Sequence, residues 1–408
     1  KLLIYRRLNI NLTQYCFKEQ LIMKKVIFGT ALASMALLSA CSSDNELANV
    51  GTTANNAIGF HVVGNKAETR ANIINTSEDI KKTDFNVFAY KNNNGEDGDI
   101  FMGGDKANEI GLYGVNIKYK NNKWDYNDPT ELRYWPTTAL NFYAVNPGST
   151  GFLSWNFTNE TKQISYNCSD EYAKDNKGEY SSAKNIDVMY AVAKNKSQID
   201  NNGIVKFNFK HILSQVVFQA KTQYANMEVV IKALSIHNFY GGGTFTIPKE
   251  EREPSQTDWA PTAVTYHSTN GLTAVMDQSI KVDKTDEVTN ISTQGPMLFI
   301  PQKLTEWDLK GNIDAVNAAN APKQSYLKIT CKIKQSGAYL FGDDTKFDEL
   351  YVPFGADWQP GKRYIYTLIF GGGYNAQGQA ILKPIKFDPE VETWGEPDAK
   401  DINININK

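Results

Sequence analysis

The sequence has few of the residues that build metal sites and no excess of charge of either sign. Its 408 residues include four histidines and four cysteines. The sequence therefore offers few ligands for a multi-histidine or multi-cysteine metal site, and we expect no metal and no cofactor. The 43 Lys and Arg residues nearly balance the 45 Asp and Glu residues, for a formal net charge of -2. Because nucleic-acid binding relies on a basic excess that neutralises phosphates, this balance excludes DNA and RNA as partners.

The sequence also lacks the motifs that carry catalysis. It contains no Gly-x-Ser-x-Gly nucleophile elbow, no phosphate-binding loop, no His-Glu-x-x-His and no Cys-x-x-Cys. The four histidines, His61, His211, His237 and His267, are scattered along the chain, and each is interpreted as a structural residue. We therefore predict a protein that is not an enzyme and has no catalytic residues.

The amino-terminal region predicts export as a lipoprotein. The first methionine is Met23, and residues 1–22 are interpreted as upstream sequence translated with the gene. Two lysines then lead to an apolar run of 13 residues, shorter than the about 20 needed to span a bilayer. The run ends in Leu38-Ser39-Ala40-Cys41, which resembles a bacterial lipobox. Residues 23–40 are thus predicted to be a lipoprotein signal peptide and Cys41 the lipidated residue. The alternative is an ordinary secretory signal with an incidental cysteine.

The other cysteines are assigned by their position and pattern. Cys16 lies upstream of the signal peptide, which leaves Cys168 and Cys331 for the folded protein. Both follow apolar residues at a period of two, which indicates the buried face of a strand, and both are interpreted as core thiols. A disulfide between them stays open as an alternative, because exported proteins meet an oxidising compartment.

Period-two alternation runs through most of the chain after a polar tether at 42–56. Strand-like runs of 5–8 residues are separated by clusters such as Asn92-Asn93-Asn94-Gly95, a pattern typical of antiparallel β-sandwiches. Short helical stretches are expected near 73–82 and 313–321. The polar stretch 194–203 precedes a strong strand signal at Val205. It predicts a boundary between an N-terminal β-sandwich domain over 71–203 and a C-terminal one over 204–394.

Two segments near the ends of the sequence share a three-pronged strand pattern. Each spans roughly 13–17 Å and places three large apolar residues on one face: Ile58, Phe60 and Val62 near the amino end, and Ile402, Ile404 and Ile406 in the segment 395–408. A strand with this pattern that is exposed is ready to pair with another chain. Arg70 follows the first segment and is the only arginine between Cys41 and Arg133.

Several local patterns, taken in order along the chain, resemble the lipoprotein-derived fimbrillins, or type V pilins. They are spread over most of the sequence. Besides the lipobox they are Phe85-Asn86-Val87-Phe88-Ala89-Tyr90, Tyr134-Trp135-Pro136, Asn141-Phe142-Tyr143-Ala144, Asp187-Val188-Met189-Tyr190-Ala191, the run 205–213, Trp358-Gln359-Pro360-Gly361-Lys362 and Val391-Glu392-Thr393-Trp394.

The resemblance implies two transthyretin-like antiparallel β-sandwich domains in tandem. In this family a trypsin-like protease cuts after an arginine, here between Arg70 and Ala71, and releases residues 41–70 with the first strand. The groove that this leaves is filled by the carboxy-terminal strand of another subunit, here 395–408, through β-strand addition. The implied partners are copies of the chain and related pilins, the maturation protease and, through the lipid before cleavage, the outer membrane. The implied location is a cell-surface fimbria used for adhesion.

Two alternatives compete with a polymerising pilin. A glycan-binding surface lipoprotein would use Trp124, Tyr126, Tyr134 and Trp135 as a sugar-stacking platform, whereas aromatic residues of this kind more often pack in cores. An anchor subunit of the same kind of fibre would keep its lipid and its first strand.

Overall fold

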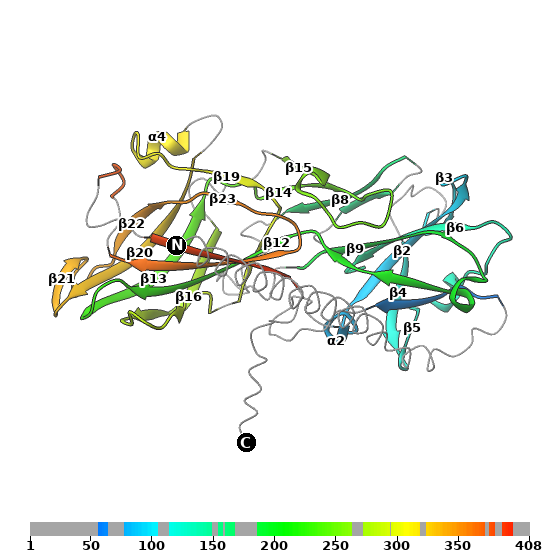
Figure 1. Cartoon of the computed structure of the whole chain (residues 1–408), viewed down its shortest axis with the longest axis horizontal. Coiled ribbons are helices and arrows are strands. Elements are labelled where there is room, and N and C mark those ends of the chain that lie inside the picture. Colours follow the sequence, from blue (N-terminus) through cyan, green and yellow to red (C-terminus); the bar gives the residue numbers. More distant parts are fainter. Residues whose placement is uncertain are drawn as a thin grey trace, which may run out of the picture. The chain divides into compact units, whose positions relative to one another are not determined.

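Strands dominate the chain, as its period-two pattern predicts (Figure 1). The computed structural model describes residues 56–63, 77–104, 114–148, 154–157, 160–167, 186–262, 272–293, 295–318, 324–371, 375–379 and 386–394. Its strands form four sheets, which confirms the all-β prediction. The short helices α2 (Ser77–Ile80) and α4 (Ile313–Ala318) lie within the two stretches where helices were expected. Over the described ranges, no helix is long and apolar enough to cross a membrane.

The first sheet is built from the amino-terminal strands and closes on itself. Its order is β10-β1-β5-β4-β2-β6-β9-β11, and β3 pairs with β2. β10 and β11 are separated by Phe209 alone, and they pair with β1 and β9 respectively. One continuous run of chain therefore bonds to both ends of the sheet. The bounds are β1 (Gly59–Val63), β2 (Asp84–Asn93), β3 (Glu96–Met102), β4 (Val115–Lys120), β5 (Lys123–Tyr126), β6 (Leu140–Asn146), β9 (Met189–Lys196), β10 (Ile204–Asn208) and β11 (Lys210–His211).

Strand β2 is buried on both faces, which explains its nearly continuous apolar sequence. Phe85, Val87 and Ala89 belong to a core within the first sheet, which we call the first core. Phe88 and Tyr90 point the other way, into a larger core shared with the rest of the chain. A strand covered on both sides reads as an apolar run rather than an alternation, so the sequence of β2 reflects its place between two cores.

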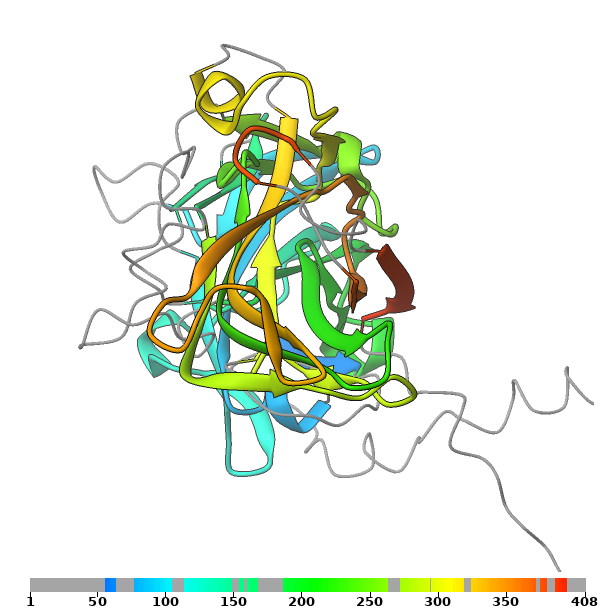
Figure 2. The ribbon, with the colours of Figure 1, turned by 90° about the vertical axis from the view of Figure 1, so that its left-hand side faces the viewer.

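Two further sheets pack around this larger core in the carboxy-terminal half (Figures 1 and 2). One has the order β17-β12-β24-β25 with β18 on β12, and the other has the order β16-β13-β20-β19-β23 with β21 and β22 on β20. The parallel pairs β1–β10, β12–β24 and β19–β20 interrupt the otherwise antiparallel pairing. The bounds are β12 (Ser214–Thr222), β13 (Met227–His237), β16 (Leu272–Val282), β17 (Thr289–Asn290), β18 (Met297–Phe299), β19 (Lys303–Glu306), β20 (Gln324–Gln335), β21 (Ala338–Phe341), β22 (Asp348–Pro353), β23 (Ala356–Asp357), β24 (Lys362–Phe370) and β25 (Lys386–Thr393).

A fourth sheet, of four strands, joins segments from the two halves of the chain. Its order is β15-β14-β8-β7, from β7 (Ser154–Phe157), β8 (Lys162–Asn167), β14 (Gly242–Thr246) and β15 (Trp259–Thr262). β8 and β14 pair from Gln163–Thr246 to Asn167–Gly242. Backbone hydrogen bonds thus link segments on either side of the predicted boundary, and β10, which follows that boundary, pairs within the first sheet. The division into 71–203 and 204–394 stays a prediction.

Asn, Gly and one Ser close the tight hairpins. Asn94-Gly95 joins β2 to β3, Asn121-Asn122 joins β4 to β5, and Ser336-Gly337 joins β20 to β21; all six residues have positive φ. Two-residue loops with this backbone follow the natural twist of the flanking strands, and Asn and Gly tolerate it best. The polar clusters that separate the predicted strands therefore mark the places where the chain reverses.

Candidate functional site

Strand β1 lies inside the first sheet, not at an edge. It pairs in parallel with β10 over five residues, from Gly59–Ile204 to Val63–Asn208. On its other side Phe60 pairs with Trp124 of β5 in antiparallel fashion. The segment that the sequence singled out as separable is therefore hydrogen-bonded on both sides, and it completes the closure of the sheet.

The three predicted apolar side chains, of Ile58 just before β1 and of Phe60 and Val62 within it, point into the first core. Ile58, Phe60 and Val62 are 1%, 3% and 7% exposed, while His61 on the opposite face is half-buried. The predicted alternation of this strand is confirmed. We call the place that these three side chains occupy the β1 groove.

The Phe60 ring occupies the middle of the β1 groove. It stacks on Phe207 of β10, with ring centroids 6.0 Å apart, and it contacts Tyr126 of β5 at 5.7 Å. Phe85 and Phe142 approach it edge-on at 6.4 and 6.5 Å. Because aromatic pairs in these geometries add to the energy of simple burial, Phe60 is the anchor of β1.

The amino end of β1 has additional hydrogen bonds beyond the strand itself. The Ile58 amide donates to the Arg133 carbonyl at 2.9 Å, and the Trp135 amide donates to the Asn56 carbonyl at 2.8 Å. The Tyr126 hydroxyl donates to the Ile58 carbonyl at 3.1 Å. Removal of β1 would leave these groups without their partners, and buried polar groups that lose partners are costly.

Three of the four aromatic residues considered as a sugar platform pack into the first core instead. Trp124, Tyr126 and Trp135 are 7%, 3% and 9% exposed, and only Tyr134 of the four is exposed, at 53%. Trp124 packs on Phe85 at 4.9 Å, and the Trp135 ring nitrogen donates to the Gly203 carbonyl at 3.1 Å. These residues do not present a set of open ring faces to a ligand.

The other residues singled out by the sequence either have structural roles or lie outside the described residues. Cys331 is fully buried with a free thiol, and burial raises the pKa of that thiol. His211 lies 3.0 Å from Asp187 and stacks on Trp394, which is a structural use of a histidine. In the part of the chain that the structure covers, no group of three or more His, Cys, Asp or Glu residues is placed to hold a metal ion. The signal peptide at 23–40 and Cys41, Arg70, Ala71, Cys168, Ile402, Ile404 and Ile406 lie outside the described residues.

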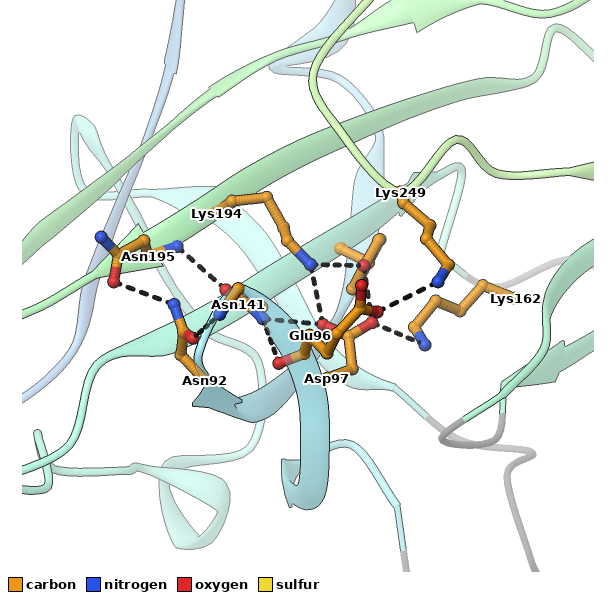
Figure 3. A network of polar contacts seen from close by, with 10 residues as sticks. Asn92, Glu96, Asp97, Asn141, Lys162, Lys194, Asn195 and Lys249 are labelled. Carbon is orange, nitrogen blue, oxygen red and sulfur yellow. Dashed lines mark hydrogen bonds and ion pairs between the residues drawn. The ribbon is translucent and has the colours of Figure 1, made fainter.

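A buried charge cluster around Asp97 fastens the four-stranded sheet to the first sheet (Figure 3). The Asp97 carboxylate, on β3, lies 2.8 Å from Lys162 Nζ of β8 and 2.9 Å from Lys194 Nζ of β9. The Tyr143 hydroxyl and the Asn141 amide donate to the same carboxylate at 2.7 and 2.8 Å. Asp97 and Lys162 side chains are 8% and 7% exposed. Because β8 belongs to one sheet and β3 and β9 to another, we call this arrangement the Asp97 clamp.

The electrostatics of the Asp97 clamp favour a permanent ion pair over proton transfer. Burial by itself would raise the pKa of Asp97, but hydrogen bonds from Lys162, Tyr143 and Lys194 outweigh it and lower that pKa to about 2. Burial lowers the pKa of Lys162, and Asp97 opposes this shift. Asp97 is therefore ionised at any physiological pH. The sequence does not reveal this cluster, because its members are far apart in the chain and form no motif.

The closed first sheet with an enclosed first strand, packed against further sheets, defines the chain as an all-β protein of the sandwich type. The sequence matches the fimbrillin-like family over residues 69–394, and the chain belongs to this family. The resemblance found in the sequence is thereby confirmed.

A solved structure agrees with this fold. A fimbrial protein from Bacteroides vulgatus ATCC 8482 is 16% identical and superposes with a TM-score of 0.52, covering 83% of this chain and 100% of that chain. The tip fimbrial protein Mfa3 from Porphyromonas gingivalis is 9% identical with a TM-score of 0.33, covering 76% of this chain and 94% of that chain. No curated protein sequence matches this one.

We expect Asp97→Asn to lower the free energy of unfolding by about 3 kcal/mol, because the buried lysines lose their counter-charge. The folded-state pKa of Asp97 lies below its usual value of 3.8, at about 2. Its contribution to stability is thus fully present above about pH 4 and is lost as the pH falls through about 2. The difference between wild type and variant should shrink over that range in urea unfolding experiments.

Asp99→Asn is the matched control for this experiment. Asp99 lies on the same strand, and its side chain is 82% exposed, so its removal should change stability by less than about 0.5 kcal/mol. An Asp97→Asn variant as stable as wild type at pH 7 would contradict the clamp.

Proposed function

We propose that this protein is a structural pilin subunit, exported as a lipoprotein lipidated at Cys41, cleaved after Arg70 and polymerised by β-strand exchange into a cell-surface fimbria used for adhesion. The observation that carries the proposal is the position of β1, which is bonded on both sides within a closed sheet. The family match supports it, because it begins at residue 69 and ends at Trp394. Both β1 and the segment 395–408 lie outside the matched region.

Cleavage after Arg70 would turn β1 from an integral strand into a separable one. The peptide bond after Arg70 connects β1 to the remainder of the fold, and once it is cut β1 is held by non-covalent contacts alone. Its loss would expose the rings that Phe60 covers, and it would leave the bonding edges of β10 and residues 133–135 unpaired. Such an edge is a template for another strand.

The carboxy-terminal segment has the pattern needed to replace β1. Ile402, Ile404 and Ile406 repeat the spacing of Ile58, Phe60 and Val62, whose side chains are buried in the β1 groove. Burial of three large apolar side chains contributes roughly 5–9 kcal/mol before ordering costs. A slip of one residue would place Asn403 and Asn405 in the groove, at a cost of roughly 1–3 kcal/mol for each unpaired amide. The register of the donor strand is therefore well defined.

Lipidation is tested at Cys41. Cys41→Ala should leave an unprocessed precursor without lipid, because the thiol that accepts the lipid is missing. Metabolic labelling with a fatty acid measures this directly, and Cys331→Ala is the control that should label as wild type does. Normal labelling of Cys41→Ala would remove the lipoprotein assignment.

Cleavage as the trigger for assembly is tested at Arg70. Arg70→Ala should stay a monomeric lipoprotein that keeps β1, because a trypsin-like protease needs a basic residue before the cut. Arg70→Lys retains the charge and should still be processed and assemble. Mass spectrometry and size analysis after protease treatment give the result. If Arg70→Ala polymerises as well as wild type, cleavage at this position is not the switch.

Donor-strand insertion is tested with Ile404. Ile404→Asp should fold and be cleaved normally but fail as a donor, because a carboxylate in the apolar groove has no partner. Asn405→Asp is the matched control on the opposite face of the strand and should assemble. Deletion of 401–408 should act like Ile404→Asp. Fibres of normal length from the deletion variant would show that this segment is not the donor.

A further inference from the structure

Two exposed apolar residues flank the point where β1 begins. Ile199 is 91% exposed and Tyr134 is 53% exposed, although both are large side chains. Each is tied to Asn56 through its neighbour: the Gln198 side chain donates to the Asn56 side chain, and the Trp135 amide donates to the Asn56 carbonyl. We call the surface formed by Tyr134, Gln198 and Ile199 the acceptor face.

We propose that the acceptor face is the docking surface for the body of the second copy of this chain that donates its strand to the β1 groove. The inference rests on the proposed function. It specifies which end of the acceptor the donor subunit covers. It also adds the direction in which the donor strand runs.

The hydrogen bonding around β1 sets that direction. β1 runs parallel to β10 through five successive pairs, and its amino end bonds to residues 133–135. A donor strand with the same direction keeps this whole set of bonds. Lys400 and Asp401 then take the positions of Asn56 and Ala57. A reversed strand would have to change the parallel pairing with β10 into an antiparallel one.

The length of the connecting segment brings the two subunit bodies together. Seven residues lie between Trp394 and Ile402, and eight Cα-to-Cα steps reach at most about 29 Å. With Ile402 in the position of Ile58, the donor's Trp394 must lie within that distance of the amino end of β1. The acceptor face adjoins the amino end of β1 and is therefore within reach of the donor's body.

The carboxy end of β25, from which the donor segment continues, is anchored to the fold and carries an exposed apolar side chain. Trp394 stacks on His211 with ring centroids 4.1 Å apart, and its amide donates to the Gly361 carbonyl at 2.9 Å. Val391 on the same strand is 58% exposed. An exposed apolar side chain therefore lies on the strand that leads into the donor segment, and in the proposed docking it would face the exposed Ile199 and Tyr134 of the acceptor. Burial of such side chains against each other is favourable.

The docking surface is tested by comparing whole subunits with an isolated strand. Cleaved Ile199→Asp protein should assemble about tenfold more slowly than cleaved wild type, because a charge meets the donor's apolar side chains. The same variant should bind a synthetic peptide of residues 395–408 as tightly as wild type does, since the peptide carries no subunit body. Leu340→Asp is the control: Leu340 is also exposed, at 43%, but it lies on β21.

The direction of the strand is tested by crosslinking between copies. With Asp401→Cys in the donor, Tyr134→Cys in the acceptor should form an intermolecular disulfide, because Tyr134 is the bridge partner of Ala57. Asn208→Cys, at the other end of the groove beside Val63, should not. The opposite result would establish a reversed donor and overturn the assigned acceptor face.

The outcomes separate the two proposals. If the peptide fails to bind cleaved wild type, strand exchange is wrong and the docking surface falls with it. If the peptide binds and Ile199→Asp assembles at the rate of wild type, strand exchange stands and the acceptor face is wrong.

Discussion

The enclosure of β1 between β10 and β5 is the constraint on which the first sheet depends. The sheet closes because the run 204–211 pairs with β1 through β10 and with β9 through β11. Phe60 fills the centre of the resulting core with four aromatic neighbours. An edge strand could leave at little cost to its neighbours. A strand in this position leaves two unpaired edges and an open apolar slot.

Apolar side chains are buried in separate cores, so the destabilisation caused by loss of β1 is confined to one of them. The residues around β1 belong to the first core, whereas the larger core contains none of the side chains of β1. The Asp97 clamp lies on the side of the first sheet that faces the four-stranded sheet, and it draws on β3, β8 and β9. Loss of β1 therefore removes support from one core, while the clamp and the larger core keep their contacts.

Under the proposed function, the enclosure of β1 has a role in assembly. A subunit that folds around its own strand would be stable during export, and it would become an acceptor once that strand is freed. The driving force for the proposed polymerisation would then be the same apolar burial that stabilises the monomer. The exposed residues beside the amino end of β1 would add the proposed second contact between subunit bodies.

Local periodicity and short ordered motifs are enough to predict the all-β class, the turns at Asn and Gly, the inward face of β1 and the family. Periodicity does not predict which distant residues lie together, and this is determined by the tertiary structure. It placed Trp124, Tyr126 and Trp135 in a core, and it put β1 within a closed sheet. It also brought together Asp97, Lys162 and Lys194. Strand pairing and ion pairing join residues that are distant in the chain, and a local sequence pattern does not identify these partners.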